Sequence, residues 1–237
     1  MWAHLHIINT TAAIALGALL SGCGPPASSP APAPPPAVEA AAPAAPAAAD
    51  ADRPVVLAVG TSLTAGYGLD PDDAWPSQLQ ARVDAAGLPH RVVNAGVSGE
   101  TSAGALRRMD WLLRQRAAVF ILETGANDML RGQDVEATRA NVDAILARAA
   151  RQDPPPRLVL LGMRAAPNLG ADYVRRFSSI YAEAARKHDA VLVPFVLEGV
   201  AGIQRLNQAD GVHPTAEGQK IIADTVWRSV EPLLRSR

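Results

Sequence analysis

The chain has a single cysteine, Cys23, among its 237 residues, so no second cysteine is available for an internal disulfide. An excess of either charge is also missing, since 22 Lys and Arg stand against 23 Asp and Glu, a formal net charge of −1. This balance argues against a nucleic-acid-binding protein and against an acidic tail. Only three histidines follow residue 52, so a ligand cluster for metal catalysis is missing as well. We therefore expect neither a metal nor another cofactor.

The N-terminal segment has the pattern of an export leader. An apolar run over residues 7–20, interrupted only at residues 9–11, is too short to span a bilayer and has the length of a signal-peptide core. It ends in Leu20-Ser21-Gly22-Cys23, which resembles the bacterial lipobox, although the first six residues carry no Lys or Arg. The resemblance implies a lipoprotein signal peptide over residues 1–22 and lipidation of Cys23. The alternative is a signal peptide cleaved without lipid, with Cys23 incidental.

Residues 24–52 are nearly all Pro, Ala and Ser. Such a composition cannot bury apolar side chains, so we predict a disordered linker over residues 23–52 that begins at the lipidated cysteine. About 30 residues could reach roughly 90 Å when fully extended, which suits a tether; a low-complexity tail without that role is the alternative. Residues 53–237, roughly 180 in number, are enough for one domain and too few for two. We expect this domain to be held at a bacterial cell envelope, facing the periplasm or the exterior.

Past the linker, apolar runs alternate with segments of helical periodicity. Five runs are predicted as strands, at residues 55–59, 91–94, 119–122, 158–161 and 191–193. Helices are predicted over residues 75–86, around 106–113, 135–146 and 174–181, and from about residue 215. Because the strands are continuously apolar rather than alternating, both faces of a parallel sheet should be covered. The predicted fold is α/β: a three-layer α/β/α domain with a five-stranded parallel sheet in the flavodoxin-like order 2-1-3-4-5.

Polar residues follow the predicted strands at their carboxyl ends. Ser62 follows the first strand, Gly96 the second and Asn127 the third, while Asp210 and His213 lie between the fifth strand and the last helix. In a parallel sheet these loops emerge on one edge, so the residues should converge there. His213 would take the proton of Ser62, and Asp210 would orient the imidazole. The oxyanion would be bound by the Ser62 N–H, the Gly96 N–H and the Asn127 amide.

Each of these residues also has an ordinary structural interpretation. Ser62 alone could be a helix N-cap, and Gly96 and Asn127 could be plain turn residues. Residues 210–214 could be a turn that leads into a helix, with Pro214 near the first helical position. The joint placement of the residues at one sheet edge favours a catalytic site.

Other catalytic and binding motifs are missing. An α/β-hydrolase elbow, G-x-S-x-G, would need glycine where Thr64 stands. No Gly-Lys-Ser/Thr P-loop occurs, and no G-x-G-x-x-G follows the first strand, which argues against nucleotide binding.

Four blocks in order make the chain resemble the SGNH hydrolases, also called GDSL-type esterases and lipases. The resemblance is closest to the bacterial arylesterase, acyl-CoA thioesterase and lysophospholipase branch, and it covers residues 53–234. The blocks are Gly-Thr-Ser-Leu-Thr-Ala-Gly-Tyr-Gly-Leu at 60–69, Asn-Ala-Gly-Val-Ser-Gly-Glu-Thr at 94–101, Gly-Ala-Asn-Asp at 125–128 and Asp-Gly-Val-His-Pro at 210–214. The resemblance implies Ser62 as nucleophile, with Gly96 and Asn127 as oxyanion donors. One departure is Thr61, which stands where the family usually has Asp.

The resemblance further implies a serine esterase or thioesterase that acts through an acyl-enzyme. Expected substrates are short- to medium-chain acyl esters, aryl esters and lysophospholipids. By their position in the sequence, Leu63, Met129, Leu130 and the loop over residues 163–170, which includes Pro167, are expected to line the acyl groove. The expected partners are a small-molecule ester or thioester and a membrane reached through Cys23, and the protein is expected to be a monomer. The alternatives are a carbohydrate O-acetylesterase on the same fold and a non-catalytic lipid-binding envelope lipoprotein, although a binding role would not need the serine, aspartate and histidine.

Overall fold

A computed structural model describes residues 53–236, so the predicted leader, Cys23 and the linker lie outside the described residues. Five parallel strands form one sheet in the order β2-β1-β3-β4-β5, which confirms the predicted fold. The strands are β1 (Val55–Gly60), β2 (Arg91–Gly96), β3 (Val119–Glu123), β4 (Arg157–Leu161) and β5 (Val191–Val193). The α-helices are α1 (Ser62–Ala65), α2 (Trp75–Ala85), α3 (Ser102–Leu112), α4 (Ala126–Leu130), α5 (Val135–Ala149), α6 (Ala171–Lys187) and α7 (Ala216–Arg235). Short 3₁₀ turns are η2 (Pro71–Asp73), η3 (Pro167–Leu169) and η4 (Gln204–Leu206).

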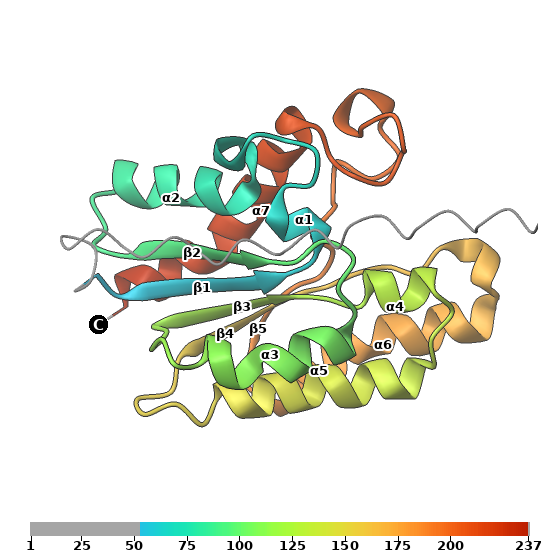
Figure 1. Ribbon diagram of the computed structural model, residues 1–237, viewed down its shortest axis with the longest axis horizontal. Coiled ribbons are helices and arrows are strands. Elements are labelled where there is room, and N and C mark those ends of the chain that lie inside the picture. Colours follow the sequence, from blue (N-terminus) through green and yellow to red (C-terminus); the bar gives the residue numbers. More distant parts are fainter. Residues whose placement is uncertain (1–52, 237) are drawn as a thin grey trace, which may run out of the picture. The chain divides into compact units, whose positions relative to one another are not determined.

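The helices cover both faces of the sheet. Helices α2 and α7 pack together on one face, while α3, α5 and α6 lie on the other (Figure 1). Every residue of β1 and β3 is buried, which explains why their sequences are apolar without alternation. No helix within residues 53–236 combines the length and apolar character needed to span a membrane.

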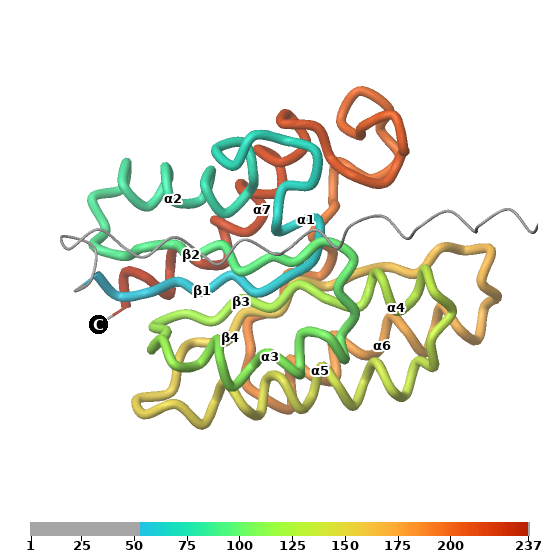
Figure 2. The backbone as a smooth tube through the Cα atoms, viewed as in Figure 1, coloured from blue at the N-terminus to red at the C-terminus, as the bar shows by residue number. Residues whose placement is uncertain are grey.

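The carboxyl ends of the strands meet at one edge of the sheet. Gly60 at the end of β1 lies opposite Gly96 at the end of β2, and all neighbouring strands run in the same direction. The short helices α1 and α4 begin just beyond β1 and β3, and the tube view shows both at this edge (Figure 2). The carboxyl edge therefore collects the loops that carry the predicted site residues.

Candidate active site

Ser62, His213 and Asp210 form a continuous hydrogen-bonded chain at the carboxyl edge. His213 Nε2 lies 2.9 Å from Ser62 Oγ, although the two residues are 151 positions apart in the sequence. His213 Nδ1 lies 2.6 Å from Asp210 Oδ2. A neutral imidazole protonated on Nδ1 satisfies both contacts, because it donates to the carboxylate and accepts the serine hydroxyl. The predicted meeting of these three side chains is therefore present in the structure.

Asp210 is held as an anion by its own loop. Its Oδ1 accepts the N–H groups of Val212 at 2.9 Å and His213 at 3.0 Å. The backbone bond from His213, the side-chain bond to its ring and the backbone bond from Val212 lower the pKa of Asp210 to about 2. At neutral pH the imidazole therefore faces a full negative charge, which favours the protonated ring that forms when a base accepts a proton.

The histidine loop is tied to the serine loop by Gln208. Its Nε2 donates to Tyr67 O at 2.8 Å and to Pro214 O at 3.0 Å, and its backbone N–H donates to His213 O at 2.7 Å. The Tyr67 ring in turn packs on the His213 ring, with centroids 4.5 Å apart. These contacts fix the position of His213 over Ser62.

Asn127 is placed at the edge by the residue that follows it. Asp128 is fully buried and accepts the Ser102 N–H at 2.8 Å and the Ser102 hydroxyl at 2.5 Å, so α4 is fixed to the start of α3. Asn127 Nδ2 donates to Glu100 O at 3.0 Å. An amide carries two N–H donors, so one remains for a ligand.

The backbone N–H of Gly96 is not an open donor in this structure, and the prediction that it serves the oxyanion is wrong here. It donates to Asn94 Oδ1 at 3.0 Å. A Cβ at Gly96 would lie 2.3 Å from the backbone nitrogen of Ala65, so the glycine is required for the close approach of β2 and α1.

Gly99, in the same sequence block, offers the donor that Gly96 does not. It has a φ of 76° and precedes Glu100, whose carbonyl binds Asn127. Its carbonyl accepts Arg131 Nη2 at 2.8 Å, while its N–H has no acceptor among the residues that the structure describes. The Ser62 N–H likewise has no acceptor within residues 53–236. The sequence signal for this donor is the second glycine of the block, three residues after Gly96.

An apolar cavity of about 430 Å³ opens beside Ser62 and His213. Leu63, Met129 and Leu130 line it as predicted, and Leu130 is 62% exposed at its mouth. Pro167 does not line the cavity, which is a correction, because it begins η3 while the preceding alanines form the wall. Of the predicted loop over residues 163–170, Met163, Arg164, Ala165 and Ala166 line the wall, and Phe195 and Leu197 are wall residues that were not predicted from the sequence. The wall therefore fits a hydrocarbon group attached to an ester carbonyl at Ser62.

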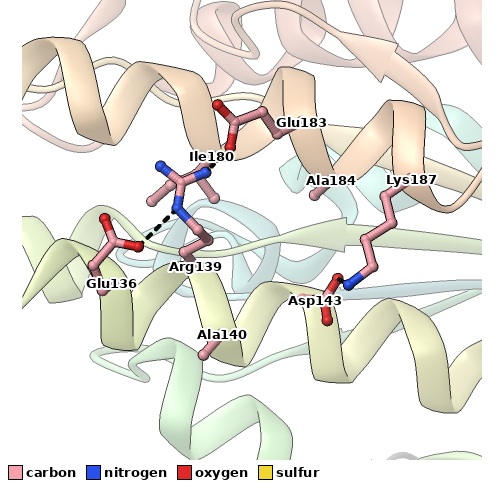
Figure 3. A pocket seen from close by; sticks show the side chains of 8 residues that line it. All are labelled: Glu136, Arg139, Ala140, Asp143, Ile180, Glu183, Ala184 and Lys187. Carbon is pink, nitrogen blue, oxygen red and sulfur yellow. Dashed lines mark hydrogen bonds and ion pairs between the residues drawn. The ribbon is translucent and has the colours of Figure 1, made fainter.

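A second hollow, of about 290 Å³, lies between α5 and α6 (Figure 3). Arg139 lies between Glu136 and Glu183 and pairs with both, and Lys187 pairs with Asp143 at 2.7 Å. Each of these charged side chains is paired with another, and none of the predicted site residues lines this hollow.

Comparison with known proteins gives a consistent result. A family model described as the GDSL-like Lipase/Acylhydrolase family matches residues 58–221. The chain is 41% identical over 180 residues to "Esterase TesA" of Pseudomonas aeruginosa, which covers 76% of this chain and 89% of that protein. It is 36% identical over 182 residues to "Thioesterase 1/protease 1/lysophospholipase L1" of Escherichia coli, covering 76% and 84%. Among solved structures, the psychrotrophic esterase EstA from Pseudoalteromonas sp., inhibited by monoethylphosphonate, has a TM-score of 0.71 and 33% identity, covering 77% of this chain and 99% of that one.

Proposed function

We propose a substrate range and a mechanism for this chain. The chain belongs to the GDSL-like lipase/acylhydrolase family and is a carboxylic ester hydrolase. It cleaves short- to medium-chain acyl esters, aryl esters and thioesters, and it does so through an acyl-enzyme on Ser62. The observation that carries this mechanism is the 2.9 Å contact between Ser62 Oγ and His213 Nε2.

Acylation begins with proton transfer from Ser62 to His213. The serine oxygen attacks the ester carbonyl while its proton moves to Nε2, and Asp210 stabilises the resulting imidazolium. When the tetrahedral intermediate collapses, His213 returns that proton to the leaving alcohol or thiol. Water then repeats the sequence on the acyl-enzyme, which releases the acid and restores Ser62.

The oxyanion is stabilised by the donors that remain open at the carboxyl edge. These are the Ser62 N–H, the second N–H of the Asn127 amide and the Gly99 N–H. One such donor typically contributes about 2.7–4 kcal/mol to the transition state.

The cavity wall supports acyl chains over sugars. Leu63, Met129, Phe195 and Leu197 offer hydrocarbon surface to a chain attached at Ser62. A carbohydrate O-acetylesterase would need several polar partners for sugar hydroxyls, whereas the polar side chains of this wall, apart from Ser62, Asn127 and His213, are Thr61, Arg164 and Asn207. A lipid-binding role without catalysis would not require the Ser62–His213–Asp210 chain.

Steady-state kinetics test the proposed reaction. Purified protein is assayed with p-nitrophenyl acetate, p-nitrophenyl octanoate and a palmitoyl thioester. Ser62→Ala and His213→Ala should each lower kcat/KM roughly 10⁴-fold or more. Ser77→Ala is the matched control, because that hydroxyl only donates to Pro71 O at 2.7 Å. Wild-type activity remaining in Ser62→Ala would refute the assignment.

We further propose that the enzyme is a monomeric lipoprotein of the bacterial envelope, anchored at Cys23 with its catalytic domain facing the periplasm or the exterior. The support is the Leu-Ser-Gly-Cys motif at residues 20–23 and the Pro/Ala-rich segment that follows it. In a bacterial host, Cys23→Ala should move the protein from the membrane fraction to the soluble fraction. A variant that remains in the membrane contradicts the lipid anchor. Light scattering of the domain tests the monomer.

A further inference from the structure

Glu123, the last residue of β3, contacts the turn that carries Ser62 and is fully buried. Its Oε2 accepts the Thr61 N–H at 2.8 Å and the Thr64 hydroxyl at 3.0 Å. The Thr61 hydroxyl lies 3.0 Å from each carboxyl oxygen. Three donors from residues on both sides of Ser62 therefore converge on one buried acid.

Glu123 forms no salt bridge with any residue that the structure describes, and its hydrogen bonds come from these neutral donors. Burial raises the pKa of Glu123, and the hydrogen bonds from the two threonines oppose that rise. The ionisable groups on the elements packed nearby are Tyr181 on α6, Asp128 on α4 and Arg108 on α3. The pKa of Tyr181 is raised by burial and then by the Glu123 charge. Asp128 bonds to α3 instead, and Arg108 Nη2 reaches the carbonyl of Gly60 at 3.5 Å.

The packing around this acid leaves little freedom. A Cβ at Gly60 would lie 2.0 Å from Thr64 Oγ1 and 2.8 Å from Glu123 Oε2, so only glycine fits there. Thr61 is 2% exposed, and its hydroxyl lies against the carboxyl group of Glu123. Two ionised carboxylates in this space would repel, whereas a hydroxyl donates a hydrogen bond.

We propose that Glu123 is a positioning residue for Ser62, and that position 61 must supply it with a hydrogen-bond donor, which in this chain is the Thr61 hydroxyl. The proposal rests on the serine-esterase function above. Thr61 directly precedes Ser62 and is held through both its backbone and its side chain, so the clamp sets the direction of the Ser62 hydroxyl and N–H. Loss of the clamp should slow the chemical step more than it weakens substrate binding.

A double-mutant cycle tests the clamp. Thr61→Val removes the hydroxyl and keeps the shape, while Glu123→Leu removes both accepting oxygens. Each should lower kcat between about 10- and 100-fold, by misplacing the nucleophile, and leave KM within about twofold. In the double variant the two losses should not multiply, because both break the same contact. Multiplied losses would mean that the Thr61 hydroxyl acts on the substrate in the cavity and would overturn the proposal.

Rescue and pH dependence separate positioning from a merely structural role. Thr61→Ser restores a donor and should recover most of the kcat lost in Thr61→Val. Thr61→Asp should share one proton with Glu123, so its kcat should fall at alkaline pH, where the wild type stays level, when that proton leaves. The combined Thr61→Asp, Glu123→Gln variant should lack this alkaline loss. A Thr61→Asp profile identical to that of the wild type would contradict the proposal, and this comparison remains decisive if Thr61→Val fails to fold.

Matched controls and a labelling assay complete the design. Thr225→Val removes a buried hydroxyl on α7 that only accepts from Arg228 at 3.1 Å, and Glu183→Gln changes a carboxylate in the α5–α6 hollow (Figure 3). Neither should change kcat. If the wild type neither hydrolyses esters nor reacts with a fluorophosphonate, the proposed function fails. If it does both while Thr61→Val keeps its kcat, only the positioning role fails.

Discussion

Replacing Asp210 with asparagine tests how the catalytic histidine is prepared. Asp210 Oδ1 accepts two backbone N–H groups, and an asparagine can keep both through its carbonyl oxygen. Its NH₂ group must then face His213 Nδ1, where Oδ2 lies at 2.6 Å in the native protein. A ring nitrogen that accepts there leaves the proton on Nε2, directed at Ser62. In that tautomer the imidazole has no lone pair for the serine proton.

The expected loss in Asp210→Asn is therefore large and confined to chemistry. We expect kcat to fall roughly 10³- to 10⁴-fold with little change in KM or Tm, because the loop bonds survive and only the tautomer changes. The assay is steady-state hydrolysis of p-nitrophenyl acetate at pH 7.5, with Asp224→Asn as the control, since that exposed carboxylate pairs with Arg82 on the outer surface. If Asp210→Asn keeps more than about a tenth of wild-type kcat, the tautomer argument is refuted.

Three further predictions concern the pH profile, a buried glutamine and the acyl cavity. As pH falls, kcat/KM should decline along a limb that reflects one proton, because protonated His213 is no base while Asp210, with a pKa of about 2, stays ionised; a two-proton limb contradicts this. Gln219, which is 1% exposed, accepts the backbone N–H of Trp75 at 2.9 Å and donates to Leu63 O at 3.1 Å. Gln219→Leu leaves two buried groups unsatisfied at 1–3 kcal/mol each, so urea unfolding should show a loss of about 2–6 kcal/mol, and a loss below about 1 would count against the bridge. Leu130→Asp should reduce kcat/KM for octanoyl esters more than for acetyl esters, and an unchanged chain-length preference would place the acyl groove elsewhere.

The sheet could be predicted because its signal is strong and local. Runs such as 119–122 are apolar at every position, which is typical of a short strand covered on both faces, and every residue of β3 is indeed buried. The short helices α1 and α4 were not predicted as elements. They have too few residues to show a helical period, and each is bounded by a glycine with positive φ: Gly66 follows the end of α1 with a φ of 74°, and Gly125 precedes the start of α4 with a φ of 101°.

At the site, the sequence sufficed for residues whose position follows from topology. The meeting of Ser62 with His213 needed only that both follow strands of one parallel sheet. The choice of Gly96 failed because the direction of an N–H group depends on a neighbouring side chain, here that of Asn94. The sequence does not predict a functional role for Glu123, because this residue directly follows an apolar run and has the position of a strand end. The signal for it is a lone acid at the end of an apolar strand, where that strand is expected to pair with the strand that precedes Ser62.

The central claim is that His213 activates Ser62 as a nucleophile. The most direct measurement is mass spectrometry of protein treated with a fluorophosphonate, since the reagent modifies an activated serine. We predict one adduct, mapped to Ser62, that forms much more slowly in His213→Ala. An adduct on another serine, or one that persists in Ser62→Ala, would contradict the account.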